Sequence, residues 1–107
     1  MPPLKTYENN ATRQSAYRRR NEEARRLERE RKGLPDLPPI PTIPGERRWA
    51  AMIREATALL NTVLQERETY FDDRSETWRD SEKGDDFQER TDAIQEVLDA
   101  LEAIDIA

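Results

Sequence analysis

The sequence contains no cysteine and no histidine among its 107 residues. The chain therefore has no thiolate nucleophile, no disulfide, no imidazole general base and no thiolate or imidazole metal ligand. These absences exclude most of the common catalytic arrangements. We expect a protein that is not an enzyme and that uses neither a cofactor nor a metal ion.

Large apolar residues are also scarce. Leu, Ile, Val and Phe together number 19 of 107 residues, a share at which chains often fail to fold unaided. Only Leu4 and Leu27 fall within residues 1–33. No run approaches the roughly 18 apolar residues of a membrane span, and the N-terminus lacks a signal-peptide core. The sequence predicts a cytoplasmic chain with one folded and one poorly folded part.

Charge, in contrast, is abundant and unevenly distributed. The net charge is −5, yet residues 1–33 carry ten basic and five acidic side chains, whereas residues 34–107 carry eight basic and eighteen acidic ones. Surfaces of opposite sign predict two kinds of partner.

Residues 1–33 are predicted to form a basic N-terminal arm. Residues 12–32 lack Gly, Pro, Val and Ile and are rich in Arg, Glu and Ala, which favours a helix that ends at Gly33. Its apolar face is limited to Tyr17, Ala24 and Leu27, too few side chains to hold it in a core. We expect this arm to be helical but mobile, or to become ordered on a partner.

Residues 34–45 repeat an aliphatic residue followed by proline every three positions. Polyproline II has three residues per turn, so this period places the four aliphatic residues on one face. A strut packed along a helix is favoured over a free linker, because a linker needs no aliphatic residues in register. These residues are Leu34, Leu37, Ile40 and Ile43.

Residues 46–107 are predicted to form an acidic helical hairpin. From Trp49 to Thr77 apolar positions recur at steps of four and three, as in one long helix over 46–83 or in two helices with a bend near Asp72 and Asp73. Gly84 is taken as the stop signal, with Asp85 or Asp86 capping a second helix over residues 86–106.

The fold class is therefore all-α: a long antiparallel hairpin, a polyproline II strut and an Arg-rich N-terminal helix. The second helix is too short to cover the first half of the long one. Folding back of the strut is favoured as the cover, and dimerisation is the competing solution. Arg67 and Arg74 face inwards in the pattern, and carboxylates across the hairpin are their expected partners. These are Glu89, Glu96 and Asp99.

A cluster of arginines in the arm is the candidate nucleic-acid site. No acidic residue lies between Asn9 and Asn21, and a tyrosine sits within the cluster. Guanidinium groups bind phosphates and an aromatic ring stacks on bases. The alternative is an ordinary solvated helix with i,i+4 pairs such as Glu22 with Arg26 and Glu28 with Lys32. The candidate residues are Arg13, Tyr17, Arg18, Arg19 and Arg20.

Carboxylates at steps of four form the candidate protein-binding site. Asp72, Glu76 and Asp80 would share one face of a continuous helix. Such a rigid array can imitate DNA phosphates or dock on a basic protein surface. The alternative is a solvated face neutralised by neighbours such as Arg79 and Lys83.

Residues 70–78, 81–84 and 87–90, which read YFDDRSETW, SEKG and FQER, resemble a hairpin segment of small uncharacterised proteins of phages, plasmids and other mobile elements. The resemblance implies a helical hairpin and a mobile-element setting, and it implies no catalytic residues.

These features predict a small accessory protein whose basic arm contacts nucleic acid and whose acidic hairpin associates with a protein or with itself, as in a homodimer. The alternative is a stoichiometric anti-defence inhibitor, of the anti-CRISPR or anti-restriction type, whose acidic helical face blocks a host nucleic-acid enzyme. No membrane partner is expected.

Overall fold

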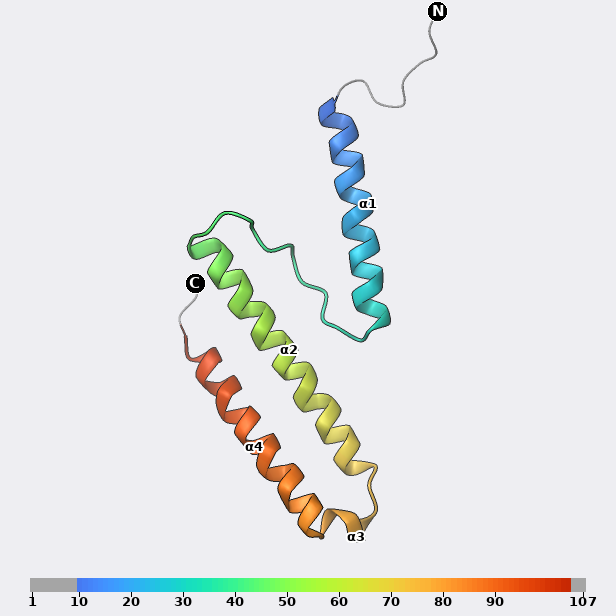
Figure 1. Ribbon diagram of the computed structural model, residues 1–107, viewed down its shortest axis with the longest axis vertical. Helices are drawn as coiled ribbons and strands as arrows, with labels where there is room; N and C mark the ends of the chain where they lie inside the picture. The colour runs from blue at the N-terminus through green and yellow to red at the C-terminus, as the bar shows by residue number, and fades with distance from the viewer. Residues whose placement is uncertain (1–9, 105–107) are drawn as a thin grey trace, which may run out of the picture. The chain divides into compact units, whose positions relative to one another are not determined.

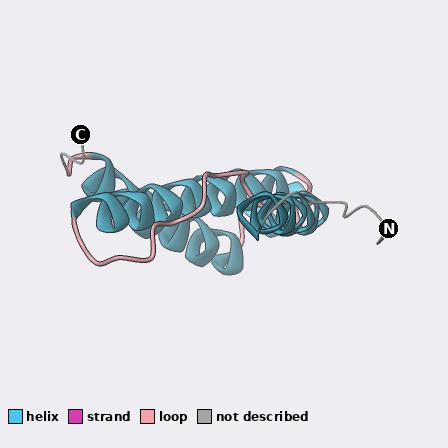
Figure 2. Cartoon of the chain, turned by 90° about the horizontal axis from the view of Figure 1, so that it is seen from above, coloured by secondary structure: helices cyan, strands magenta, loops and turns pink. Residues whose placement is uncertain are grey.

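In a computed structural model, the structure describes residues 10–104. Residues 1–9 of the basic arm and the end of the last predicted helix, residues 105–107, lie outside the described residues. The described part consists of helices and loops (Figure 2). Its four helices are α1 (Asn10–Arg31), α2 (Glu46–Asp72), α3 (Glu76–Arg79) and α4 (Glu82–Glu102). The predicted all-α class is confirmed.

The chain divides into two units between Asp36 and Leu37. The boundary falls within the predicted strut, so residues 34–36 belong with α1 and residues 37–45 belong with the hairpin. The first unit carries ten basic and six acidic side chains, and the second carries eight basic and seventeen acidic ones. The opposite signs seen in the sequence therefore correspond to separate units.

The helix of the first unit ends at the predicted glycine. Gly33 has a φ of 72°, a left-handed conformation that glycine adopts without steric cost. Beyond it, the amide of Leu34 donates to the carbonyl of Arg29 at 2.8 Å, as in a Schellman motif. The Nε of Arg29 also donates to the carbonyl of Pro35 at 2.9 Å. These bonds hold residues 34–35 against the end of α1.

The second unit is a hairpin in which α2 and α4 pack side by side and run antiparallel, joined by the short α3 (Figure 1). Its core is thin. Leu98 of α4, 2% exposed, is the only buried apolar side chain among the described residues. Only α4 packs along the length of α2 in this unit, and one helix cannot cover the whole apolar surface of another. Much of the apolar surface of α2 therefore stays accessible to solvent.

The predicted helix over 46–83 is interrupted, in agreement with the bent alternative. α2 ends at Asp72, and Ser75 adopts an extended conformation in which its Oγ accepts a hydrogen bond from the amide of Trp78 at 3.2 Å. The bend turns Trp78 back onto an aromatic cluster. Its ring lies 6.1 Å from those of Tyr70 and Phe71 and 5.8 Å from that of Phe87. Edge-to-face contacts of this kind stabilise the turn.

The prediction that Gly84 stops a helix was wrong. Gly84 lies in the first turn of α4, and Ser81 caps this helix by accepting a hydrogen bond from the Gly84 amide at 3.3 Å. Gly84 is buried, and a Cβ there would lie 2.6 Å from the carbonyl oxygen of Trp78 and would also meet that of Arg79. The glycine therefore permits a close approach of the α3 backbone, and the cap, Ser81, lies four residues before Asp85.

The predicted strut forms neither helix nor strand, and part of it lies beside α2. Nη1 of Arg48 donates to the carbonyl of Pro41 at 2.9 Å, and Leu37 and Ile40 are partly buried. The expectation that all four aliphatic residues pack was wrong for Ile43, which is 79% exposed. The chain bends at Thr42 and Ile43 before α2 begins, and this bend breaks the three-residue period.

Candidate functional site

The arginine segment, residues 13–20 of α1, is exposed apart from Ala16, which is partly buried. Tyr17 is 60% exposed. At spacings of four and three, Arg13, Tyr17 and Arg20 share one face of the helix. Arg18 and Arg19 point to other sides, because each residue turns the helix by about 100°. Three of the five predicted residues therefore lie together, and the other two extend positive charge around the helix.

Residues 21–32, the second half of α1 and the residue after it, nearly balance their own charge, with five basic and four acidic side chains. Lys32 and Glu28 form the predicted pair at 3.2 Å, whereas Arg26 contacts Glu30 at 3.8 Å instead of Glu22. All four paired side chains are about half exposed or more, so the pairs contribute little to stability. They leave the net positive charge of α1 concentrated in the arginine segment.

The three acidic candidates do not share a helical face. Asp72 is the last residue of α2, Glu76 is the first of α3, and Asp80 caps the C-terminal end of α3. The extended conformation of Ser75 separates the two helices. All three carboxylates are exposed, but the regular spacing expected along a continuous helix is absent.

Arg67 faces α4 as predicted, but its partners are not carboxylates. Its Nε donates to Oγ1 of Thr91 at 2.9 Å, and its Nη2 donates to the carbonyl of Phe87 at 2.8 Å. The guanidinium carbon lies 3.9 Å from the centre of the Phe87 ring. Arg74 likewise lies over the ring of Tyr70 at 4.2 Å. Both arginines therefore contribute to the hairpin through aromatic rings.

The predicted carboxylate partners of these arginines point elsewhere. Glu89 and Glu96 are exposed, and Asp99 accepts a hydrogen bond from Nε2 of Gln95 on its own helix at 2.9 Å. Backbone and hydroxyl acceptors at the α2–α4 contact satisfy Arg67 without a buried carboxylate, which avoids the cost of desolvating a second charge.

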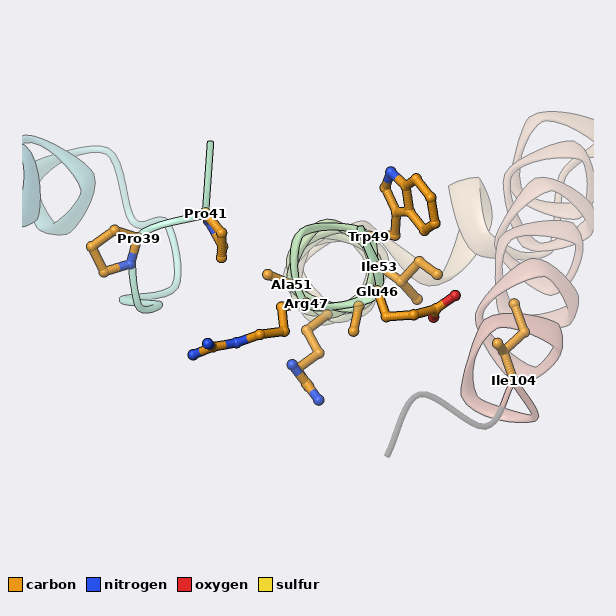
Figure 3. A pocket seen from close by; sticks show the side chains of 10 residues that line it. Pro39, Pro41, Glu46, Arg47, Trp49, Ala51, Ile53 and Ile104 are labelled. Carbon is orange, nitrogen blue, oxygen red and sulfur yellow. The ribbon is translucent and has the colours of Figure 1, made fainter. Parts of the chain in front are cut away.

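A groove of about 500 Å³ lies at the N-terminal end of α2. In Figure 3, Trp49 and Ile53 point from α2 toward the side of α4, where Ile104 lies, and Pro39 and Pro41 flank the opposite side of α2. The walls also include charged side chains such as Arg47. The groove lies where the shorter α4 no longer covers α2, so its exposed apolar surface reflects the mismatch in helix length.

The sequence prediction did not single out an exposed apolar row on α2. Trp49, Met52, Val63 and Tyr70 are each 39–50% exposed. Together with positions 56, 59 and 66 they follow one another at alternating steps of three and four residues. Trp49, Val63 and Tyr70 belong to the apolar stripe with steps of four and three that the sequence shows, and Met52 widens that stripe. The exposure of these side chains could be seen only once the structure showed which side of α2 is packed against α4.

Within residues 10–104, no group of three or more acidic side chains is placed to hold a metal ion. In the same part of the chain, no helix has the length and apolar character needed to cross a membrane. No protein family, curated protein or solved structure matches this chain. A functional hypothesis therefore depends on the chemistry of the surfaces described above.

Proposed function

We propose that this chain is a small non-enzymatic accessory protein of a mobile element, which contacts nucleic acid through the arginine segment and associates with a protein or with itself through the hairpin. The observation that carries the proposal is the density of charge, with four arginines in eight residues and no carboxylate among them. The resemblance of residues 70–90 to phage and plasmid hairpin proteins supports the mobile-element setting.

The distribution of the arginines suits a nucleic-acid groove. A helix with its side chains is about 10–12 Å across, and the major groove of DNA is about 12 Å wide. Phosphates line both walls of that groove. Arginines such as Arg18 and Arg19, which leave the helix on different sides, would reach both walls, while Tyr17 provides a ring that can stack on an unpaired base.

The polarity of α1 also favours an anionic ligand. The N-terminal end of a helix carries a partial positive charge, and acidic side chains normally offset it. The first turn of α1 contains none, and the arginine segment follows within one turn. A phosphate backbone bound there would relieve this repulsion, so binding should also stabilise the helix.

The hairpin is poorly suited to bind nucleic acid itself. Its unit carries nine more acidic than basic side chains and would repel phosphates. Its exposed apolar surface is typical of a region that contacts protein. We therefore assign nucleic-acid binding to α1, in the positively charged unit, and protein association to the hairpin, in the negatively charged unit.

Fluorescence anisotropy with duplex DNA, single-stranded DNA and RNA tests the proposal. Four phosphate contacts predict a slope near −3.6 in a plot of log affinity against log salt on duplex DNA, at about −0.9 for each contact. Replacing the four arginines of the segment with alanine should abolish binding at moderate salt. The substituted residues are Arg13, Arg18, Arg19 and Arg20.

A matched control removes the same number of charges from residues 25–32. The control variant replaces Arg25, Arg26, Arg31 and Lys32 with alanine and should retain most of the affinity, because these residues lie among carboxylates. Equal losses in the two variants would mean that only net charge matters. Absence of wild-type binding to all three nucleic acids at low salt would refute the proposal.

The inhibitor alternative has one supporting observation, the exposure of the carboxylates at the hairpin tip. Lysine at positions Asp72, Glu76 and Asp80 should eliminate capture of a protein partner from a bacterial lysate if that surface binds it. Capture that survives these changes but is lost after nuclease treatment would favour nucleic-acid binding through the arginine segment.

A further inference from the structure

One face of α1 combines an exposed aromatic ring with positive charge on both sides of it. Tyr17 is 60% exposed, and each residue turns an α-helix by about 100°. Arg13 and Arg20 therefore leave the helix on one side of Tyr17, within about 60° of it. Arg18 leaves on the other side, about 100° away, whereas Arg19 points about 160° away from the ring. The surface centred on this ring is called the Tyr17 face below.

Two amide side chains complete the Tyr17 face. Gln14 precedes the ring by three residues and Asn21 follows it by four, so both lie beside it on the helix surface. Both are about 40–60° from the ring, on the side of Arg18. All members of the face are exposed, and no acidic residue occurs within positions 10–21. The members are Arg13, Gln14, Tyr17, Arg18, Arg20 and Asn21.

We propose that the Tyr17 face binds single-stranded nucleic acid, with one unpaired base stacked on the ring and phosphates on the arginines at either side. This inference rests on the proposed function and specifies the ligand of the same segment. Every base has a flat aromatic face that can stack on a tyrosine. In a duplex the adjacent base pairs cover these faces, so the ring would meet only base edges. A single strand is the ligand that uses both the ring and the charge.

The length of the Tyr17 face suits a short stretch of one strand. Arg13 and Arg20 lie seven residues apart, which is about 10.5 Å along the helix axis at 1.5 Å per residue. Stacked nucleotides of one strand rise about 3.4 Å each, so this length corresponds to about three nucleotides. A strand that follows the face passes Arg13, the ring and Arg20 in turn. Arg18 reaches its phosphates from the opposite side of the ring.

The two amides provide hydrogen-bonding partners for the stacked base. Proteins that bind single strands combine stacking on aromatic rings with hydrogen bonds to the exposed edges of the bases. Gln14 and Asn21 each carry N–H donors and a carbonyl acceptor without a net charge. Carboxylates at these positions would repel the adjacent phosphates. The Tyr17 face therefore places a stacking surface, base-edge partners and phosphate-binding groups side by side.

Arg19 makes a duplex and a single strand distinguishable. In a duplex groove, with phosphates on both sides of the helix, Arg19 contributes together with the other three arginines. A single strand on the Tyr17 face leaves Arg19 out, because this side chain points away from the ring. The slope of log affinity against log salt should be about −3.6 for four contacts on a DNA duplex but about −2.1 for three contacts on a single strand. Single-strand binding should therefore decline less steeply as salt rises.

Fluorescence anisotropy of the full-length chain with a single-stranded DNA, a single-stranded RNA and a duplex of the same length tests the inference. Tyr17→Ala should lower the affinity for single strands about fivefold or more. It should leave the salt slope unchanged, because no phosphate contact is lost, and duplex affinity should hardly change. Tyr17→Phe keeps the ring and should retain single-strand binding. Circular dichroism of each variant establishes that α1 is intact.

Two neighbouring exposed arginines provide a matched pair of variants. Arg18→Ala and Arg19→Ala remove the same charge, and both should weaken duplex binding. Only Arg18→Ala should weaken single-strand binding and make its salt slope shallower by about 0.7. Equal losses of single-strand affinity in the two variants would overturn the placement of the strand on the Tyr17 face.

Photochemical cross-linking locates the stacked base directly. A single strand that contains bromouracil should become attached to Tyr17 on irradiation, and attachment to the hairpin instead, at a residue such as Tyr70, would overturn the inference. Binding to either single strand with this pattern supports the inference, and the tighter of the DNA and RNA complexes identifies the strand.

Failure of the inference and failure of the proposed function give different results. Single-strand affinity that is unaffected by Tyr17→Ala, but is lost in the variant without the four arginines of the segment, would overturn the inference and leave the proposed function intact. A wild-type chain that binds no nucleic acid at low salt would refute both.

Discussion

Replacement of Leu98 by alanine should cost the hairpin a large part of its stability. Leu98 is the only buried apolar side chain in the described residues. Removing three carbon atoms forfeits about 2.4 kcal/mol of transfer free energy, at about 0.8 kcal/mol for each group. The cavity left between α2 and α4 adds to this loss, and measured Leu-to-Ala costs span about 2–5 kcal/mol. We expect a loss of about 3 kcal/mol.

That loss is large for a unit of this size. A unit of about 70 residues has a free energy of unfolding of roughly 4–10 kcal/mol, so Leu98→Ala removes a third or more of it. The melting temperature should fall by about 12–24 °C, at about 4–8 °C for each kcal/mol. Both tryptophans lie in the second unit. Urea unfolding followed by tryptophan fluorescence therefore reports the hairpin without a signal from α1.

Val97 provides the matched control for this experiment. It is adjacent to Leu98 on the same helix but is 54% exposed, so Val97→Ala should change stability by no more than about 0.5 kcal/mol. Both variants should be compared with the wild type at one protein concentration, because association would add to the measured stability. If the two variants lose the same free energy, the argument that a single side chain forms the centre of the core is refuted.

Three further substitutions test local features by urea unfolding. Gly84→Ala should destabilise the hairpin by about 1–3 kcal/mol despite the higher helix propensity of alanine, because its Cβ would meet the carbonyls that end α3; unchanged stability would contradict that close approach. Ile40→Ala should cost about 1 kcal/mol or more, whereas Ile43→Ala, at an exposed position, should cost nothing measurable, and equal effects would contradict the packing of residues 37–41 against α2. Ser81→Ala should cost about 1 kcal/mol through loss of the α4 cap, and a neutral result would contradict the reassigned start of that helix.

Local signals in the sequence were sufficient for much of the fold. The end of α1 at Gly33 was predicted because a left-handed glycine and its capping bonds depend on neighbouring residues alone. Gly84 was wrongly predicted to end a helix, because the sequence does not distinguish a glycine that lets another backbone segment approach closely from one that adopts a left-handed conformation. The difference lies in the α3 backbone that meets Gly84, which no local pattern specifies.

The candidate site was predictable to a similar degree. The exposure of Arg18 and Arg19 followed from composition, because α1 has too few apolar residues to be buried. The row of carboxylates failed as a prediction because its spacing assumed a continuous helix, which the conformation of Ser75 interrupts. The partners of Arg67 could not be predicted from side-chain charge, because one of them is the backbone carbonyl of Phe87.

The division of charge between the two units makes the chain a block polyampholyte. Its sequence pI of about 4.9 describes neither block, because the first unit is cationic and the second is anionic at neutral pH. One unit should be retained by heparin or a cation exchanger and the other by an anion exchanger. Salt would then release the chain from either support, and the pI of the whole chain would fail to indicate affinity for a polyanion.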